Sequence, residues 1–225
     1  MARPLKRPPR SPGPADTRTR ILAAAADEFG TRGFAATSVD RIALRARVNK
    51  AMIYYHFKDK RALYGAILRS IWATIGERLH AVAALPLPPA ARLDRLIDTL
   101  VQALDEERLF LPIFLRELAD GGAHLGREEL GLIAGIFATV SGVIAEGVRT
   151  KNFQPVHPGL AHFSLIGPLV MFQASAPVRA RVRELTKARI PDADAATVTH
   201  HLQMVARRML APASTEELHA EKKRR

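Results

Sequence analysis

The sequence predicts an all-α protein, and three observations support this fold class. After Pro14 there is no proline until Pro86, which leaves room for uninterrupted helices. Apolar residues recur at helical spacing, and no segment alternates with a period of two for long enough to form a strand. Hydrophobic residues make up 48% of the 225 residues and charged residues 25%, so the chain can bury a core of its own.

Charge divides the chain into two parts. Residues 1–70 contain 15 Lys and Arg against 5 Asp and Glu, whereas residues 71–225 contain 19 against 17. A basic amino-terminal third followed by a nearly neutral, apolar body indicates that one part meets a polyanion and the other has a separate task.

The amino-terminal segment 1–15 holds five of the 15 prolines and is expected to be a flexible basic arm. The first helix is expected to begin at Asp16, a good N-cap, and to continue to about Arg32. Gly33 suits the left-handed residue that ends a helix. The apolar stripe of this helix consists of Ile21, Leu22, Ala25 and Phe29.

Two short helices are expected next. Thr37 can cap the first of them by accepting from the Asp40 amide while Asp40 returns the bond, as in a capping box. Asn49 is a strong N-cap for the second, which ends near Phe57. The pair, joined by the tight turn 46–48, has the outline of a helix-turn-helix, whose second helix enters the DNA major groove. The surrounding cations are Arg41, Arg45, Arg47, Lys50, Lys58, Lys60 and Arg61.

A fourth helix is expected from Asp59 to about Ala83, where prolines then interrupt the chain. Pro158 sits where a first helical residue should be, and Asp192 or Asp194 can cap the last helix. The further helices are expected near 90–106, 109–119, 127–150, 158–175 and 192–210.

The string TSVDRIALRARVNKAMIYYHFKDKRALYGAIL occupies residues 37–68 and follows Phe29-x-x-x-Gly33-Phe34. With these motifs, residues 17–75 resemble the DNA-binding domain of the TetR family of transcriptional regulators. The later helices are similar to that family's ligand-binding and dimerisation body in size, helicity and placement. The resemblance implies four segments: the basic arm 1–15, a helix-turn-helix DNA-binding domain 16–60, a helical ligand-binding and dimerisation domain 61–212, and a charged tail 213–225.

By position, the resemblance implies nine DNA-contacting residues. The two hydroxyl residues that open the second helix would touch phosphate. Lys50 would reach a guanine edge or a phosphate, and the two apolar residues after it a thymine methyl. The three aromatic residues would brace against backbone or bases, with one tyrosine mostly packed, and Lys60 would hold a phosphate. The nine are Thr37, Ser38, Lys50, Ala51, Met52, Tyr54, Tyr55, His56 and Lys60.

The turn between the two short helices departs from the family's pattern. That pattern often has Gly where this chain has Arg47. If the turn needs a positive φ, Arg47 adopts it at a cost in strain, although its side chain can add a phosphate contact.

The apolar pattern and the resemblance together imply a homodimer on a palindromic DNA site. The expected interface combines the helices at 158–175 and 192–210. The first offers Leu160, Phe163, Ile166, Gly167, Val170 and Met171. The second offers the seam Val198, Leu202, Val205 and Met209.

The resemblance also implies a small apolar effector that binds in the body and acts by preferring one dimer geometry. Aromatic residues at helical spacing are also typical of an ordinary core, so an effector pocket and a packed core both stay open as interpretations. The candidate lining residues are Trp72, Gln102, Phe110, Phe114, Phe137, Ser141, His162 and Phe163, followed by Phe172 and Gln173.

We therefore expect a cytoplasmic, sequence-specific transcriptional regulator, and a repressor by the family's commoner habit. No enzyme motif such as G-x-S-x-G, a P-loop or H-E-x-x-H occurs, so no catalytic residue, cofactor or metal is expected. The absence of cysteine excludes thiol catalysis and thiolate metal sites. The basic start lacks an apolar signal region, and prolines interrupt the apolar stretch 153–178, so no membrane partner is expected.

Two alternative functions stay open. A sequence-independent architectural DNA-binding protein, driven by the basic end, would bind with a steep salt dependence and no preferred site. A ligand carrier or membrane-surface protein of the same shape would keep ligand binding without DNA binding.

Overall fold

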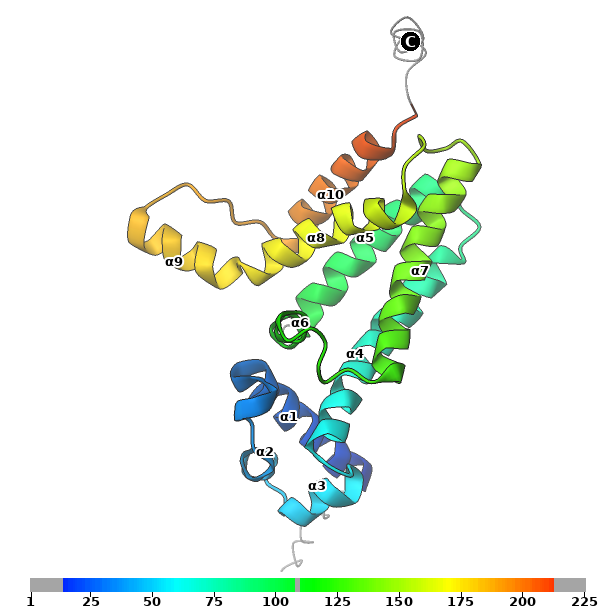
Figure 1. Cartoon of the computed structure of the whole chain (residues 1–225). Helices are drawn as coiled ribbons and strands as arrows, with labels where there is room; N and C mark the ends of the chain where they lie inside the picture. Colours follow the sequence, from blue (N-terminus) through cyan, green and yellow to red (C-terminus); the bar gives the residue numbers. More distant parts are fainter. Residues whose placement is uncertain (1–13, 108–109, 213–225) are drawn as a thin grey trace, which may run out of the picture. The chain divides into compact units, whose positions relative to one another are not determined.

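The computed structural model describes residues 14–107 and 110–212, and within these ranges the chain is helical without a strand (Figure 1). The all-α prediction is confirmed. The helices are α1 (Pro14–Ala36), α2 (Val39–Ala46), α3 (Lys50–His56), α4 (Lys60–Ala83), α5 (Pro89–Glu106), α6 (Phe110–Ala119), α7 (Arg127–Arg149), α8 (Pro158–Ala174), α9 (Ala176–Thr186) and α10 (Ala195–Leu210).

The chain forms two compact units that meet within α4, between Ile67 and Leu68. The expected boundary lay earlier, after residue 60. The first turns of α4 belong with the first unit because Tyr64 is buried there, edge-on to the rings of Phe29 and Phe34 at centroid distances of 4.9 and 5.1 Å. The predicted arm and charged tail fall largely outside the described residues, at 1–13 and 213–225.

In the first unit, the core draws on all four helices. Three residues of the predicted α1 stripe are buried, and Leu22 is half-buried. The fully buried apolar side chains are Ile21, Ala25, Phe29, Ile42, Ile53 and Leu63. The apolar periodicity therefore located this core correctly.

Helix ends in the first unit agree with the sequence at some positions and differ at others. Helix α1 begins at Pro14, so Asp16 lies in its first turn and is not its N-cap. Gly33 has φ 77°, and this break in helical geometry matches the predicted helix-ending residue. Asn49 caps α3 as predicted, because its Oδ1 accepts from the Ala51 amide at 2.9 Å.

The predicted capping box at α2 is wrong. Ser38, and not Thr37, is the N-cap of α2, and its Oγ accepts from the Arg41 amide at 3.3 Å. Thr37 is only 2% exposed, and its hydroxyl is within donor distance of the carbonyl oxygens of Gly33 at 2.8 Å and Glu28 at 3.1 Å. Thr37 therefore ties the end of α1 together while the next residue opens α2.

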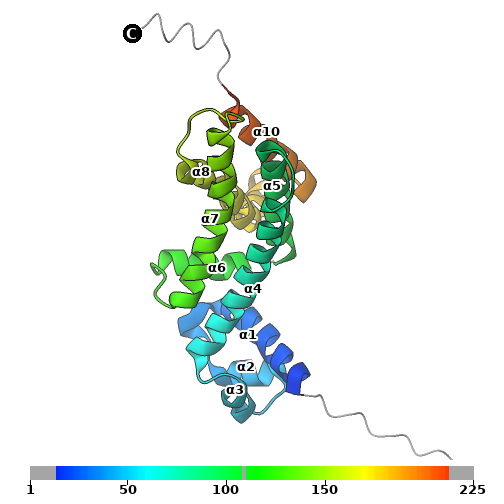
Figure 2. The ribbon, with the colours of Figure 1, turned by 90° about the vertical axis from the view of Figure 1, so that its right-hand side faces the viewer.

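In the second unit, α5 packs against both α7 and α10, and α7 also packs against α8 (Figure 2). The predicted helices at 90–106, 109–119, 127–150, 158–175 and 192–210 are confirmed as α5, α6, α7, α8 and α10. Pro158 lies in the first turn of α8, and Asp194 caps α10 by accepting from the Thr197 amide at 2.8 Å.

Helix α9 was not predicted. It follows α8 with a bend of 52° between the two axes, and it extends away from the rest of the second unit before the chain returns to α10 (Figure 1). None of its residues is buried. Because α9 buries nothing, its sequence lacks the continuous apolar stripe by which the other helices of this unit were found.

By length and composition, α7 is apolar enough to cross a membrane, and the bent pair α8–α9 passes the same test. The sequence had pointed to 153–178 as the nearest candidate. In the fold, α7 packs along α5 and α8, and 22% of its most apolar stretch of 18 residues is buried.

Candidate functional site

The second helix of the helix-turn-helix is α3. One face of α3 packs into the core of the first unit, and the opposite face is exposed. Ile53 is fully buried, and Phe57 directly after the helix is 5% exposed. The predicted contact residues divide by exposure: Lys50, Ala51, Tyr54 and Tyr55 are exposed, and Met52 and His56 are half-buried. The arrangement leaves one polar and aromatic face of α3 open to a partner.

The expectation that one tyrosine is mostly packed is wrong. Tyr54 is 48% exposed and Tyr55 is 79% exposed. The reason is the length of α3, because a helix of seven residues buries a single side chain, Ile53, and has no room for a second. His56 lies edge-on to the Tyr55 ring at 5.2 Å between centroids, so these two aromatic residues form one surface.

Lys50, the first residue of α3, forms an ion pair with Asp40 in the first turn of α2. Its Nζ lies 2.8 Å from Asp40 Oδ1. The hydrogen bond to Asp40 raises the pKa of Lys50 above its ordinary value, so the ammonium stays charged. The pair links the two helices across the turn between them.

The Lys60 side chain forms hydrogen bonds within the first unit. Its Nζ donates to the carbonyl oxygens of Phe34 at 2.8 Å and Thr37 at 2.9 Å, and it lies 4.3 Å from the centroid of the Phe34 ring. Lysine often satisfies carbonyls at the end of a helix in this way. The expected phosphate contact of Lys60 therefore conflicts with its geometry, as does that of the buried Thr37 hydroxyl.

Several of the predicted cations are paired inside the first unit. Arg41 Nε bonds Glu28 Oε2 at 3.1 Å, and Arg45 Nη2 bonds Asp27 Oδ2 at 2.7 Å. Glu28 is only 7% exposed and also pairs with Arg32 at 3.3 Å. These arginines hold α2 against α1, whereas Arg47 and Lys58 are exposed and carry their charge at the surface.

Sequence reasoning missed two residues of this frame. Arg20 Nη2 donates to the carbonyl oxygens of Ala46 at 2.5 Å and Arg47 at 3.1 Å, which anchors the turn between α2 and α3 to α1. Glu28 forms ion pairs with the arginines described above. A polar residue on a helix gives no signal of a distant partner, and the partner of Arg20 lies 26 positions away.

The turn does require a left-handed residue. Arg47 ends α2 with φ 54° and ψ 47°, and its amide bonds back to the carbonyl oxygens of the helix. For a residue with a Cβ this conformation carries about 1 kcal/mol of strain or more. The strain expected where the family pattern has Gly is therefore present.

In the second unit, the predicted effector-lining residues fall into two aromatic clusters. In the first, the Phe110 ring stacks on Phe114 with centroids 5.3 Å apart and lies edge-on to Trp72 at 6.0 Å. In the second, Phe137 lies edge-on to His162 at 4.9 Å, next to Phe163. Burial lowers the pKa of His162, which is 6% exposed.

The two polar candidates bond locally. Gln102 is exposed and donates to the Asp98 carboxylate one turn earlier at 3.1 Å, and Ser141 Oγ donates to the Phe137 carbonyl oxygen at 2.6 Å. None of the eight predicted lining residues borders the three cavities described for this part of the chain. Aromatic spacing gives the same pattern for packing residues as for a pocket, so the role of these residues in binding an effector stays a prediction.

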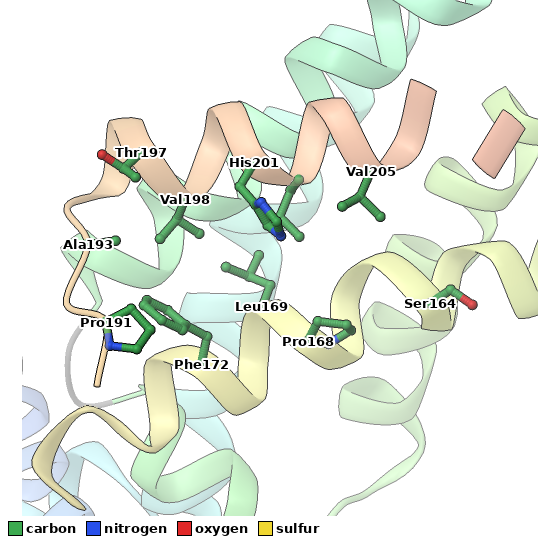
Figure 3. Close-up of a pocket in the computed structure, with 11 residues that line it drawn as sticks. Ser164, Pro168, Leu169, Phe172, Pro191, Ala193, Thr197, Val198, His201 and Val205 are labelled. Atoms are coloured by element: carbon green, nitrogen blue, oxygen red, sulfur yellow. The ribbon is translucent and has the colours of Figure 1, made fainter. Parts of the chain in front are cut away.

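Two cavities border the end of α8, where the further candidates Phe172 and Gln173 lie. One, of about 520 Å³, is lined by Gln173 together with residues of α5, α6 and α9. The other, of about 540 Å³, is apolar and lies between α8 and α10, with Phe172 and Leu169 facing Val198 and Val205 (Figure 3).

Part of the predicted dimer surface is buried by contacts within the chain. Val198 and Leu202 are 8% and 6% exposed, and Val205 and Met209 are half-buried, because α10 packs on α5. On α8, Ile166 and Val170 are also half-buried. Three large apolar residues of α8 stay open to solvent: Leu160, Phe163 and Met171 are 66%, 62% and 65% exposed.

Known proteins share this arrangement. The model of the family described as bacterial regulatory proteins, tetR family, matches residues 21–67. The transcriptional repressor KstR2 of Rhodococcus jostii is 30% identical over 143 residues, which cover 63% of this chain and 70% of that protein. The chain belongs to the TetR family. The helix-turn-helix, α2 and α3, lies within the residues that the family model matches.

Other transcriptional regulators match parts of the chain or its fold. The transcriptional repressor Rv3405c of Mycobacterium tuberculosis is 40% identical over 78 residues, or 35% of this chain, and the chain spans 39% of that relative's length. The structure of FadR from Bacillus subtilis, in complex with stearoyl-CoA, superposes with a TM-score of 0.68 at 16% identity, over 84% of this chain and 96% of FadR. At that identity the likeness establishes the fold alone.

Proposed function

We propose that this TetR-family chain is a sequence-specific transcriptional repressor that binds a palindromic DNA operator as a homodimer and acts in the cytoplasm. One observation carries the proposal: α3 is anchored through Ile53 and capped by Asn49, and its opposite face exposes Lys50, Ala51, Tyr54 and Tyr55. A short, rigid helix with such a face suits the major groove.

The proposal divides the contacts by role. Lys50, Ala51 and Met52 read base edges, because they occupy the start of the recognition helix. The surrounding contacts to phosphate come from five exposed residues and the half-buried His56, which position the protein without reading sequence. They are Ser38, Arg47, Tyr54, Tyr55, His56 and Lys58. Thr37 and Lys60 are left out, since their hydroxyl and ammonium groups bond within the first unit.

The dimer is proposed to form through α8 and α10. Leu160, Phe163 and Met171 would be buried against a second copy, and the apolar cavity between α8 and α10 would receive side chains of the partner. A symmetric interface presents two recognition helices to the two halves of a palindrome.

We infer that a small apolar ligand releases the repressor from DNA. The support is the apolar interior of the second unit and the fold that it shares with FadR, whose structure contains stearoyl-CoA. The cavity that Gln173 borders is a candidate site. A ligand there can act only by binding better to a dimer geometry that DNA does not accept.

The test is selection from a random pool of DNA duplexes at about 0.15 M salt, with the dimer mass measured by analytical ultracentrifugation. An enriched palindrome together with a dimeric mass is the expected result. Binding of all duplexes without enrichment would overturn the proposal in favour of an architectural DNA-binding protein. A monomeric mass would overturn the proposed interface.

A further inference from the structure

The ion pair between Lys50 and Asp40 is the one described contact that joins the base-reading end of α3 to α2 through side chains of opposite charge. Both side chains are open to solvent, with 45% of Lys50 and 70% of Asp40 exposed. The pair thus lies on the surface that we propose to face DNA, and it holds the Lys50 ammonium beside Asp40.

Helix electrostatics explain why the two residues suit each other. Lys50 is the first residue of α3, where the positive end of the helix dipole disfavours a cation. Asp40 lies in the first turn of α2, where the same effect favours an anion. Their pairing offsets the unfavourable position of Lys50 and holds its ammonium between the two helices.

The pair also removes Lys50 from the general attraction to DNA. A cation that neutralises a phosphate releases a counterion and strengthens binding to every sequence alike. The Lys50–Asp40 pair as a whole has no net charge to offer a phosphate, and the carboxylate repels a phosphate that approaches. A base edge, with neutral acceptor atoms, suffers less from this repulsion and can share the ammonium.

We propose that Asp40 is a positioning residue for DNA recognition, which holds Lys50 over one base pair of the operator and away from the phosphates. This inference rests on the proposed DNA-binding function. It assigns Asp40 to specificity, although a carboxylate on a DNA-facing surface weakens binding overall. Without Asp40, the flexible Lys50 side chain turns to the nearest phosphate.

The chain offers a matched control. Asp27 is also a surface carboxylate of the first unit, and it also pairs with one cation, since Arg45 Nη2 lies 2.7 Å from its Oδ2. Arg45 lies in the last turn of α2 and keeps a second partner in Glu28 at 3.6 Å. Asp27→Asn therefore removes the same charge without releasing a residue of the recognition helix.

The experiment measures binding of the full chain to its selected operator, to operators changed at each base pair, and to an unrelated duplex, at several salt concentrations. We expect Asp40→Asn to strengthen binding to the unrelated duplex about tenfold and to steepen its salt slope by about 0.9. It should also relax base preference at one operator position. Lys50→Met should relax preference at the same position, and Asp40→Asn should add nothing to that relaxation in the Lys50→Met background.

Two further variants complete the design. Asp40→Glu, which keeps the charge, should restore most of the base preference, and Asp27→Asn should leave that preference unchanged. Equal effects of Asp40→Asn and Asp27→Asn, without any change of base preference, would show that charge alone matters and would overturn this proposal. If the unaltered chain enriches no operator, the proposed function fails first. If it enriches one and Asp40→Asn still reads it normally, only the positioning role fails.

Discussion

The Lys60 ammonium lies 2.9 Å from the carbonyl oxygen of Thr37, so the first residue of α4 holds the segment that joins α1 to α2. Thr37 in turn bonds back to Glu28 and Gly33 within α1. Two residues expected at DNA are thus partners in one partly buried hydrogen-bond network. The network fixes where α2 begins, and it therefore helps to position the helix-turn-helix.

Lys60→Ala should therefore act on stability. A hydrogen bond from a charged donor contributes about 1.5–3 kcal/mol, and Lys60 makes two, although the Phe34 carbonyl oxygen would keep the Thr37 amide at 3.3 Å. We expect a loss of about 2 kcal/mol in the free energy of unfolding, measured by urea denaturation followed by circular dichroism. The salt slope of DNA binding should stay the same in the folded variant. An unchanged free energy of unfolding together with a flatter salt slope would instead make Lys60 a phosphate contact.

Arg47→Gly should stabilise the first unit. Arg47 has φ 54°, and glycine removes strain of about 1 kcal/mol, part of which is offset by the greater freedom of glycine in the unfolded chain. The expected gain is up to about 1 kcal/mol in the same denaturation experiment. DNA binding should weaken by the loss of one exposed cation. Lys151→Gly is a suitable control, since Lys151 also has a positive φ, of 59°, in the second unit.

Stability should fall in mildly acidic solution because of His162. Burial lowers the pKa of His162 in the folded chain, so between that pKa and its ordinary value near 6.5 the unfolded chain binds more protons than the folded one. The stability that this neutral histidine confers is complete above about pH 6.5 and is lost as the pH falls towards the lowered pKa.

The variant His162→Phe removes this titration and keeps an aromatic ring beside Phe137. The free energy of unfolding should fall less between pH 7.5 and pH 5 in His162→Phe than in the unaltered chain. His201→Phe serves as the control, because His201 is exposed. An equal fall in all three proteins would place the pH dependence elsewhere.

Phe163→Glu should break the proposed dimer. Phe163 is 62% exposed on α8, and a carboxylate in its place would have to lose its water on burial against a second copy. Sedimentation should show half the mass of the unaltered protein, with unchanged helicity and weaker operator binding. Leu185 on α9 is 72% exposed and lies outside the proposed interface. Leu185→Glu also replaces an exposed apolar side chain by a carboxylate, and this variant should stay dimeric. A dimeric Phe163→Glu would exclude the α8 surface.

The sequence by itself determined the helices that bury an apolar stripe and the caps that act over one turn. Asn49 and Gly33 could be assigned because a cap bonds within its own turn, and a helix-ending glycine needs only its own backbone freedom. The recognition helix followed from the same local rules. Even the strain at Arg47 could be anticipated, since it depends on one residue and its turn.

The tertiary structure alone decided which polar groups remain available to a partner. Lys60 meets Phe34 across 26 positions and Arg45 meets Asp27 across 18, and no local pattern encodes such pairings. The aromatic residues of the second unit follow the same rule, because a buried ring looks alike in sequence whether it packs against another ring or borders a cavity. Apolar periodicity indicates which face of a helix is buried, but only the three-dimensional packing decides which residues that face contacts. The candidate site depends on these contacts.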